Sequence, residues 1–195
     1  MVENVQSFHG PLSERVRSQV VAYCGDLKGR LLDVGCGNGL LFDELASYAN
    51  LNCYGVDRSV ELLMAVRQRR RGEVGCTNGM MDQLPFRDAS FEAVTCLNTL
   101  LNIPSLELVS GALHEMMRIS SGHVIVDIRN GDNPYMRMKY WWHGRHADFP
   151  TVAYRLRDIE ALFQAGGFRV EQAFPSGINL RTLAWGYVVV GKRNR

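Results

Sequence analysis

Hydrophobic and polar positions follow two different periods along the chain. Apolar residues at 12, 16, 20 and 23 recur at helical spacing and predict a helix over 12–24 that ends at Gly25. Short apolar runs bounded by glycine or polar residues are typical of buried strands instead. The same reading predicts further helices over 40–49, 60–70, 105–119 and 158–165, and strands over 30–34, 51–56, 74–77, 93–97, 124–128, 168–174 and 183–190.

The order of these elements predicts the fold class. Strands alternate with helices over most of the chain, which is typical of a doubly wound α/β fold with a mostly parallel sheet. The last two strands are too close in sequence for a crossover helix, so we expect an antiparallel C-terminal hairpin. Residues 130–151 combine glycine, asparagine, proline, aromatic and basic residues, and we interpret them as an irregular connection.

Composition narrows the function classes. The 195 residues, 46% of them hydrophobic, fit one domain with a substantial core. Net charge is 22 minus 20, or +2, which is too mild to indicate nucleic-acid binding by itself.

The five cysteines form no C-x-x-C pair, so we expect no metal site and reduced thiols in the cytoplasm. We expect neither a secretory signal nor a membrane span, because no apolar run approaches about 18 residues.

The glycine-rich segment Leu31–Gly39 (LLDVGCGNG) points to a nucleoside ligand. A predicted strand runs into a tight turn whose three glycines let backbone N–H groups approach a ligand closely. Asp57 ends the next strand, where a carboxylate can accept hydrogen bonds from both ribose hydroxyls. The spacing G-x-G-x-G differs from that of a dinucleotide loop, and Asp33 would repel a pyrophosphate. Together these features favour S-adenosylmethionine, which carries a ribose and an ammonium group but no phosphate.

Five segments resemble the motifs of class I S-adenosylmethionine-dependent methyltransferases. They are LLDVGCGNG (31–39), GVDRS (55–59), MMDQLPFRDASFEAV (80–94), ALHEMMRISSG (112–122) and LRDIEALFQAGGF (156–168). The resemblance implies a single Rossmann-like methyltransferase domain over 1–195, with seven strands, acting on a small molecule.

The resemblance also implies roles for single residues. The glycine loop would line the methionine moiety, with Asp33 near its ammonium group and Asp57 on the ribose. The chain departs from the family at Met80, where an acid often meets the adenine amino group. The implied cofactor-binding residues are Asp33, Gly35, Cys36, Gly37, Gly39, Asp57, Arg58, Met80, Met81, Asp82 and Asn98.

Residues 130–151 follow the fifth strand, and we expect them to form a substrate lid over the cofactor edge. Their aromatic and basic side chains suit a planar, apolar or acidic acceptor. Packing of the tryptophans onto the sheet is the simpler interpretation. If the acceptor must lose a proton, His143, His146 and Tyr140 are the candidate catalytic bases.

Two other functions remain open at this stage. The basic run Arg67–Arg71 and the basic lid would also suit an acceptor on tRNA or another RNA, although basic residues at a helix end are more often solvated. The lack of an obvious base leaves room for a non-catalytic S-adenosylmethionine-binding protein.

Overall fold

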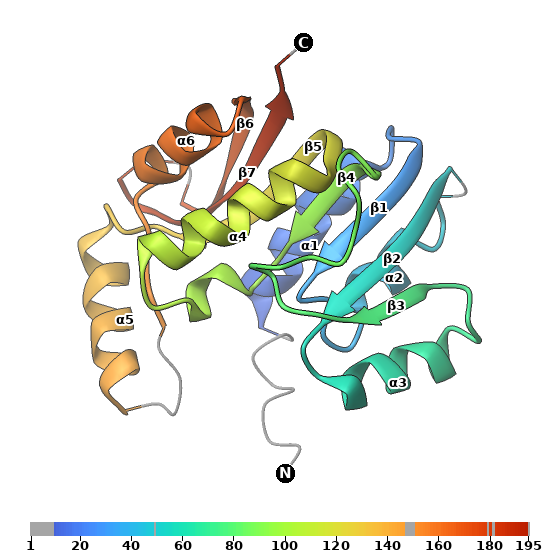
Figure 1. Cartoon of the computed structure of the whole chain (residues 1–195). Coiled ribbons are helices and arrows are strands. Elements are labelled where there is room, and N and C mark those ends of the chain that lie inside the picture. Colours follow the sequence, from blue (N-terminus) through green and yellow to red (C-terminus); the bar gives the residue numbers. More distant parts are fainter. Residues whose placement is uncertain (1–9, 49, 147–150, 179, 181, 195) are drawn as a thin grey trace.

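A seven-stranded sheet with helices on both faces forms the molecule in a computed structural model (Figure 1). The structure describes residues 10–48, 50–146, 151–178, 180 and 182–194. The strands are β1 (Gly29–Val34), β2 (Leu51–Asp57), β3 (Gly75–Asn78), β4 (Phe91–Cys96), β5 (Ser120–Arg129), β6 (Phe168–Gly177) and β7 (Ala184–Arg193). The helices are α1 (Pro11–Cys24), α2 (Leu40–Leu45), α3 (Val60–Arg69), α4 (Leu106–Ile119), α5 (Pro134–His146) and α6 (Leu156–Ala165), with a short 3₁₀ helix at Leu100–Asn102.

The strand order is β3-β2-β1-β4-β5-β7-β6. Strands β1 to β5 run parallel, and β7 is antiparallel to both β5 and β6. This confirms the predicted Rossmann-like sheet with its C-terminal hairpin. The order reverses between β1 and β4, and the crevice at the carboxyl ends of such neighbours is where doubly wound sheets bind ligands.

The core consists of two main layers, one on each face of the sheet. Leu32 of β1 packs with the apolar side of α4 and α6, whereas the adjacent Leu31 packs with α1 and α2. Successive residues of a strand point to opposite faces, so uninterrupted apolar runs are needed where both faces are covered. Each fully buried leucine of this kind contributes about 1.5–3 kcal/mol by burial.

The predicted irregular connection is wrong for residues 134–146, which form helix α5. Asn133 starts the helix, because its side-chain oxygen accepts the N–H groups of Tyr135 at 3.0 Å and Met136 at 3.3 Å. Pro134 follows at a first-turn position, where its missing N–H costs nothing. The asparagine and proline therefore mark a helix start rather than a loop.

The predicted helix over 40–49 is also too long, since α2 ends at Leu45. The Tyr48 N–H donates to the Leu45 carbonyl at 2.9 Å, an i to i+3 bond that tightens the chain into a turn.

Candidate functional site

The glycine loop between β1 and α2 is fastened to the end of β2. The N–H groups of Gly35 and Cys36 both donate to the Val56 carbonyl, at 2.8 and 3.1 Å. Gly35 has φ +75°, and a Cβ there would lie 2.6 Å from Thr99 Oγ1. Only glycine fits this position, for both conformational and steric reasons.

Asp57 is tied directly to the loop. Its Oδ2 accepts the Gly37 N–H at 2.8 Å, and its Oδ1 accepts the Ser59 N–H at 2.9 Å. A carboxylate has about four acceptor positions, so both oxygens can still accept from a ligand hydroxyl. The two features that pointed to a nucleoside therefore lie next to each other.

Asp33 is a buried carboxylate at the floor of the site. It is 5% exposed, and its Oδ1 accepts the Thr95 hydroxyl at 2.7 Å. Burial raises the pKa of Asp33 to about 7, and the charge of Asp57 adds to this, against the lowering effect of the Thr95 hydrogen bond. A cationic group placed beside Asp33 would favour its ionised form.

A pocket opens between the loop, the end of β4 and helix α1. Its lining includes Arg17, Asp33, Gly35, Cys36, Leu97 and Asn98. Cys36 contributes as a neutral thiol, since burial raises its pKa well above the ordinary value. The structure thus brings four of the expected cofactor-binding residues to one pocket, with Gly37 and Asp57 bonded beside it.

A buried polar network closes the other side of the pocket. Asn98, at φ +53°, accepts the Ser13 hydroxyl at 3.1 Å and Arg129 Nη2 at 2.8 Å with its side-chain oxygen. Arg129 Nη1 also donates to Asp127 Oδ2 at 2.6 Å, and its Nε donates to the Tyr140 hydroxyl at 3.2 Å. Asn98 is thereby held in an unusual backbone conformation by elements far apart in sequence.

Arg129 remains charged inside this network. Burial alone would lower the pKa of Arg129, but the negative charge of Asp127 and the contact with Tyr140 outweigh it and raise the pKa. Neither Asp127 nor Arg129 was predicted from the sequence as a site residue. The segment VIVDIR places them two positions apart in a buried strand, so that they share one face, and that spacing was the available signal.

The remaining expected site residues lie outside the pocket lining. Arg58, Met80 and Asp82 are exposed, Met80 by 55%, whereas Met81 packs partly against the core. Gly39 caps α2 at φ +75°. Tyr140 is half-buried, and His143 and His146 lie in α5, where the structure describes their backbone and not their side chains.

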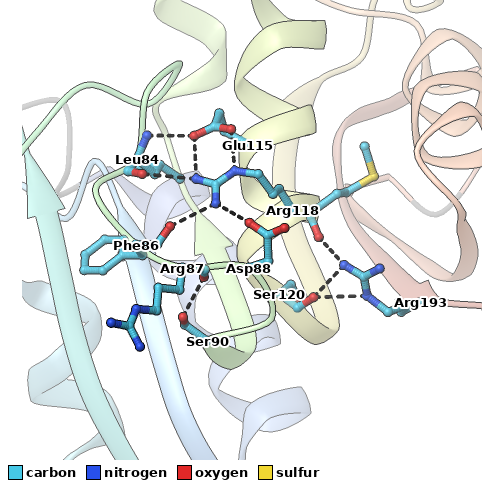
Figure 2. A network of polar contacts seen from close by, with 10 residues as sticks. Leu84, Phe86, Arg87, Asp88, Ser90, Glu115, Arg118, Ser120 and Arg193 are labelled. Carbon is cyan, nitrogen blue, oxygen red and sulfur yellow. Dashed lines mark hydrogen bonds and ion pairs between the residues drawn. The ribbon is translucent and has the colours of Figure 1, made fainter.

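The segment after Met81 is held in place by Arg118 of α4 (Figure 2). Arg118 donates to the carbonyls of Leu84 at 3.1 Å and Phe86 at 2.9 Å, and pairs with Asp88 and Glu115, each at 2.7 Å. Glu115 in turn accepts the Leu84 N–H at 2.9 Å. One guanidinium therefore fixes the loop that the resemblance assigns to the adenine side.

Comparison with known proteins agrees with this geometry. A methyltransferase domain family matches residues 32–126. Ubiquinone biosynthesis O-methyltransferase of Alkalilimnicola ehrlichii is 35% identical over 123 residues, covering 59% of this chain and 48% of the relative. Sterol 24-C-methyltransferase of Neurospora crassa is 32% identical over 96 residues, covering 46% of this chain and 25% of the relative. The chain thus spans between a quarter and about half of these relatives' lengths.

The fold is shared with a solved methyltransferase. Magnesium protoporphyrin IX methyltransferase from Synechocystis PCC 6803, crystallised with bound SAH, superimposes with a TM-score of 0.79 at 19% identity. The match covers 100% of this chain and 89% of that one. The domain match and the relatives identify residues 32–126 as part of an S-adenosylmethionine-dependent methyltransferase domain, and the whole described chain shares the fold of that solved enzyme.

The residues present fit that cofactor. The loop offers a turn that only glycine can make, Asp57 retains acceptor capacity, and Asp33 is a buried carboxyl group whose ionised form a cationic ligand group would stabilise. Among the described residues, no cluster of side chains could hold a metal ion. In the same part of the chain, no helix is long and apolar enough to cross a membrane.

Proposed function

We propose that the protein transfers a methyl group from S-adenosylmethionine to a small molecule with a largely apolar body. The single observation that carries the proposal of S-adenosylmethionine as cofactor is the hydrogen bond between Asp57 and the Gly37 N–H beside the pocket. The relatives named for ubiquinone and sterol substrates support the proposed class of acceptor. Both kinds of substrate are lipid-soluble ring compounds.

The cofactor supplies a methyl group already activated on a sulfonium, so the protein's contribution is alignment and a dry site. Asp33 would orient the cofactor through its ammonium group, and Asp57 would hold the ribose. Asn98 would face the sulfonium region from the end of β4, fixed there by Ser13 and Arg129. An in-line displacement requires this fixed direction, because the acceptor must approach opposite the leaving sulfur.

The lid proposed over 130–151 would cover the acceptor and exclude water. Helix α5 forms most of it and meets the network through Tyr140, whose hydroxyl accepts from Arg129. Where the acceptor must lose a proton, Tyr140, His143 and His146 are the bases we propose. Acceptors that are already nucleophilic need none of them.

The test is transfer of a labelled methyl group from S-adenosylmethionine to a panel of prenylated hydroxyquinols, sterols and tRNA. We expect label in the organic phase with at least one ring lipid, and none in tRNA. Label in tRNA alone would contradict the proposed acceptor class. No transfer to any acceptor, despite cofactor binding, would favour a non-catalytic role.

A further inference from the structure

Helix α5 carries its large apolar side chains on the outside. Tyr135, Met138, Trp141 and Trp142 are 59%, 63%, 55% and 61% exposed. Their spacing of three and four residues places them on one side of the helix. The opposite side contains the buried Met136 and the half-buried Tyr140. A helix that only covers a core would show the reverse arrangement.

The connection between β6 and β7 also exposes apolar side chains, and it is joined to the start of α5. The Asn133 side chain, at the start of α5, donates to the carbonyls of Leu183 at 3.1 Å and Ala184 at 3.2 Å, which joins the two segments. Figure 1 shows α5 at the flank of the molecule, on the side of β6 and β7 and away from β1 to β3. We call the combined set the aromatic surface: Tyr135, Met138, Trp141, Trp142, Ile178, Leu180, Leu183 and Trp185.

All three tryptophans of the chain belong to the aromatic surface. Trp185 is 43% exposed, close to the values of the two on α5. Tryptophan is costly to leave in water, yet its ring suits a boundary that is apolar on one side and wet on the other. Two exposed tryptophans on one helix, and a third next to the segment that Asn133 joins to that helix, indicate a partner of that kind.

The charged side chains of helix α5 have one sign, and the nearby Asp132 is paired with Arg155 at 3.5 Å. Helix α5 contains Arg137, Lys139 and Arg145 and no acidic residue. At about 100° per residue, Arg137 and Lys139 flank the apolar stripe on either side. The Arg145 guanidinium lies 4.2 Å from the centre of the Trp141 ring, so that cation and ring are presented together. The complement of this pattern is an anionic layer over an apolar one.

We propose that the aromatic surface docks on the surface of an anionic lipid bilayer. Tryptophan, tyrosine and the aliphatic side chains would enter the headgroup and upper acyl region, and the three basic residues would meet lipid phosphates. Aliphatic Leu180, Leu183 and Met138 argue against RNA, because stacking on bases would leave them in water. Helix α5 begins at Pro134, shortly after β5 ends at Arg129, so docking would bring the carboxyl end of β5 toward the membrane.

This placement also narrows the acceptor class to substrates dissolved in the bilayer, an inference that rests on the proposed function. A substrate dissolved in the bilayer could pass from the acyl region along α5 to the carboxyl edge of the sheet, where Tyr140 meets Arg129 and Arg129 meets Asn98 of the pocket, without crossing water. The docking itself needs neither cofactor nor turnover. Vesicle binding and methyl transfer therefore fail or succeed separately.

The intrinsic fluorescence of the protein tests the docking. All three tryptophans lie on the proposed contact, so adding vesicles of phosphatidylcholine with about one phosphatidylglycerol in three lipids should shift the emission to the blue. Co-sedimentation with the same vesicles should be strong, and weaker by about tenfold on pure phosphatidylcholine or at molar salt. An unshifted spectrum, or equal sedimentation on both vesicle types, would overturn the proposal.

Variants locate the contact. Trp141→Ala/Trp142→Ala should weaken sedimentation by about tenfold or more. The matched control is Val60→Ala/Met64→Ala on α3, which removes two apolar side chains that are 54% and 52% exposed and should change nothing. Arg137→Gln/Lys139→Gln should weaken binding to anionic vesicles, whereas Arg15→Gln/Arg169→Gln, with the same change in net charge at exposed positions, should not.

Two further outcomes would overturn the proposal. One is a mass in solution of two chains that falls to one in Trp141→Ala/Trp142→Ala, which would assign the surface to a second copy. The other is binding of tRNA at physiological salt that the same variant abolishes. Circular dichroism of each variant confirms that α5 is still folded.

Discussion

The carboxylates at the ends of β1 and β2 differ from the charged pair at the end of β5 in how many of their hydrogen bonds the protein itself supplies. At the ends of β1 and β2, Asp33 and Asp57 have few partners, and their oxygens retain capacity to accept from a ligand. At the ends of β4 and β5, Asp127 and Arg129 satisfy each other and hold Asn98 in place. A polar group can recognise a ligand only with hydrogen-bonding capacity that the protein has not consumed. The half of the pocket at β1 and β2 is therefore suited to binding, and the half at β4 and β5 to positioning.

The largest effect should come from breaking the buried ion pair. Arg129→Met leaves Asp127, which is fully buried, without its counter-charge, and should lower the free energy of unfolding by about 3–5 kcal/mol. Urea denaturation measures this. The double variant Asp127→Asn/Arg129→Met should recover much of the loss. If Arg129→Met has the free energy of unfolding of the wild type but has lost turnover, the network acts in ligand recognition. The contrast between a binding half and a positioning half of the pocket would then be wrong.

The next effect concerns the cofactor half. Asp57→Asn keeps the shape of the side chain but replaces an acceptor oxygen by a donor facing the N–H groups of Gly37 or Ser59. Loss of charge-assisted hydrogen bonds worth about 1.5–3 kcal/mol should weaken S-adenosylhomocysteine binding by about tenfold to a hundredfold. Calorimetric titration gives the value. Asp26→Asn, at an exposed position after α1, serves as the control and should bind normally.

The adenine-side loop should depend on the geometry of Arg118 rather than on its charge. Lysine cannot reproduce a fork that reaches two carbonyls and two carboxylates, so Arg118→Lys should lose about 1–2 kcal/mol of unfolding free energy. The expected loss of unfolding free energy is modest because the Arg118 side chain is 27% exposed, and solvent weakens its ion pairs. Arg87→Lys in the same loop is the matched control, and equal stabilities of the two variants would refute the positioning role.

The smallest effect is a pH dependence from Asp33. Its folded pKa, about 7, lies above its ordinary value, so the free protein loses stability as pH rises from about 4 toward about 7. Binding of a ligand ammonium favours the ionised form, so affinity for S-adenosylhomocysteine should rise up to about tenfold between about pH 6 and about pH 8. Asp33→Asn should bind weakly with a flat profile. A wild-type profile that is equally flat would contradict this role.

Much of the sheet could be predicted because its signals are local. The nine residues LLDVGCGNG (31–39) combine an apolar run with a glycine turn. They therefore specify both a buried strand and the turn that ends it. The pairing of Asp57 with the loop also followed from topology, since parallel neighbours end at the same edge. These inferences needed no knowledge of distant contacts.

The expectation of an irregular connection over 130–151 was wrong for residues 134–146, because it rested on the composition of the segment and not on the order of its residues. Helix α5 contains glycine and many aromatic residues, which suggested a loop, but Asn133 and Pro134 occupy the positions that start a helix. The Asn98 network joins α1, β4, β5 and α5, and its members are separated by up to 127 positions along the chain, from Ser13 to Tyr140. No local pattern could specify contacts of that range.

The most direct test of the account is a calorimetric titration of S-adenosylhomocysteine into the wild-type protein. The account predicts saturable binding of one ligand per chain, with release of a proton from Asp33 when the titration is made below about pH 7. Absence of any saturable heat at several temperatures would contradict the assignment of this pocket to the cofactor.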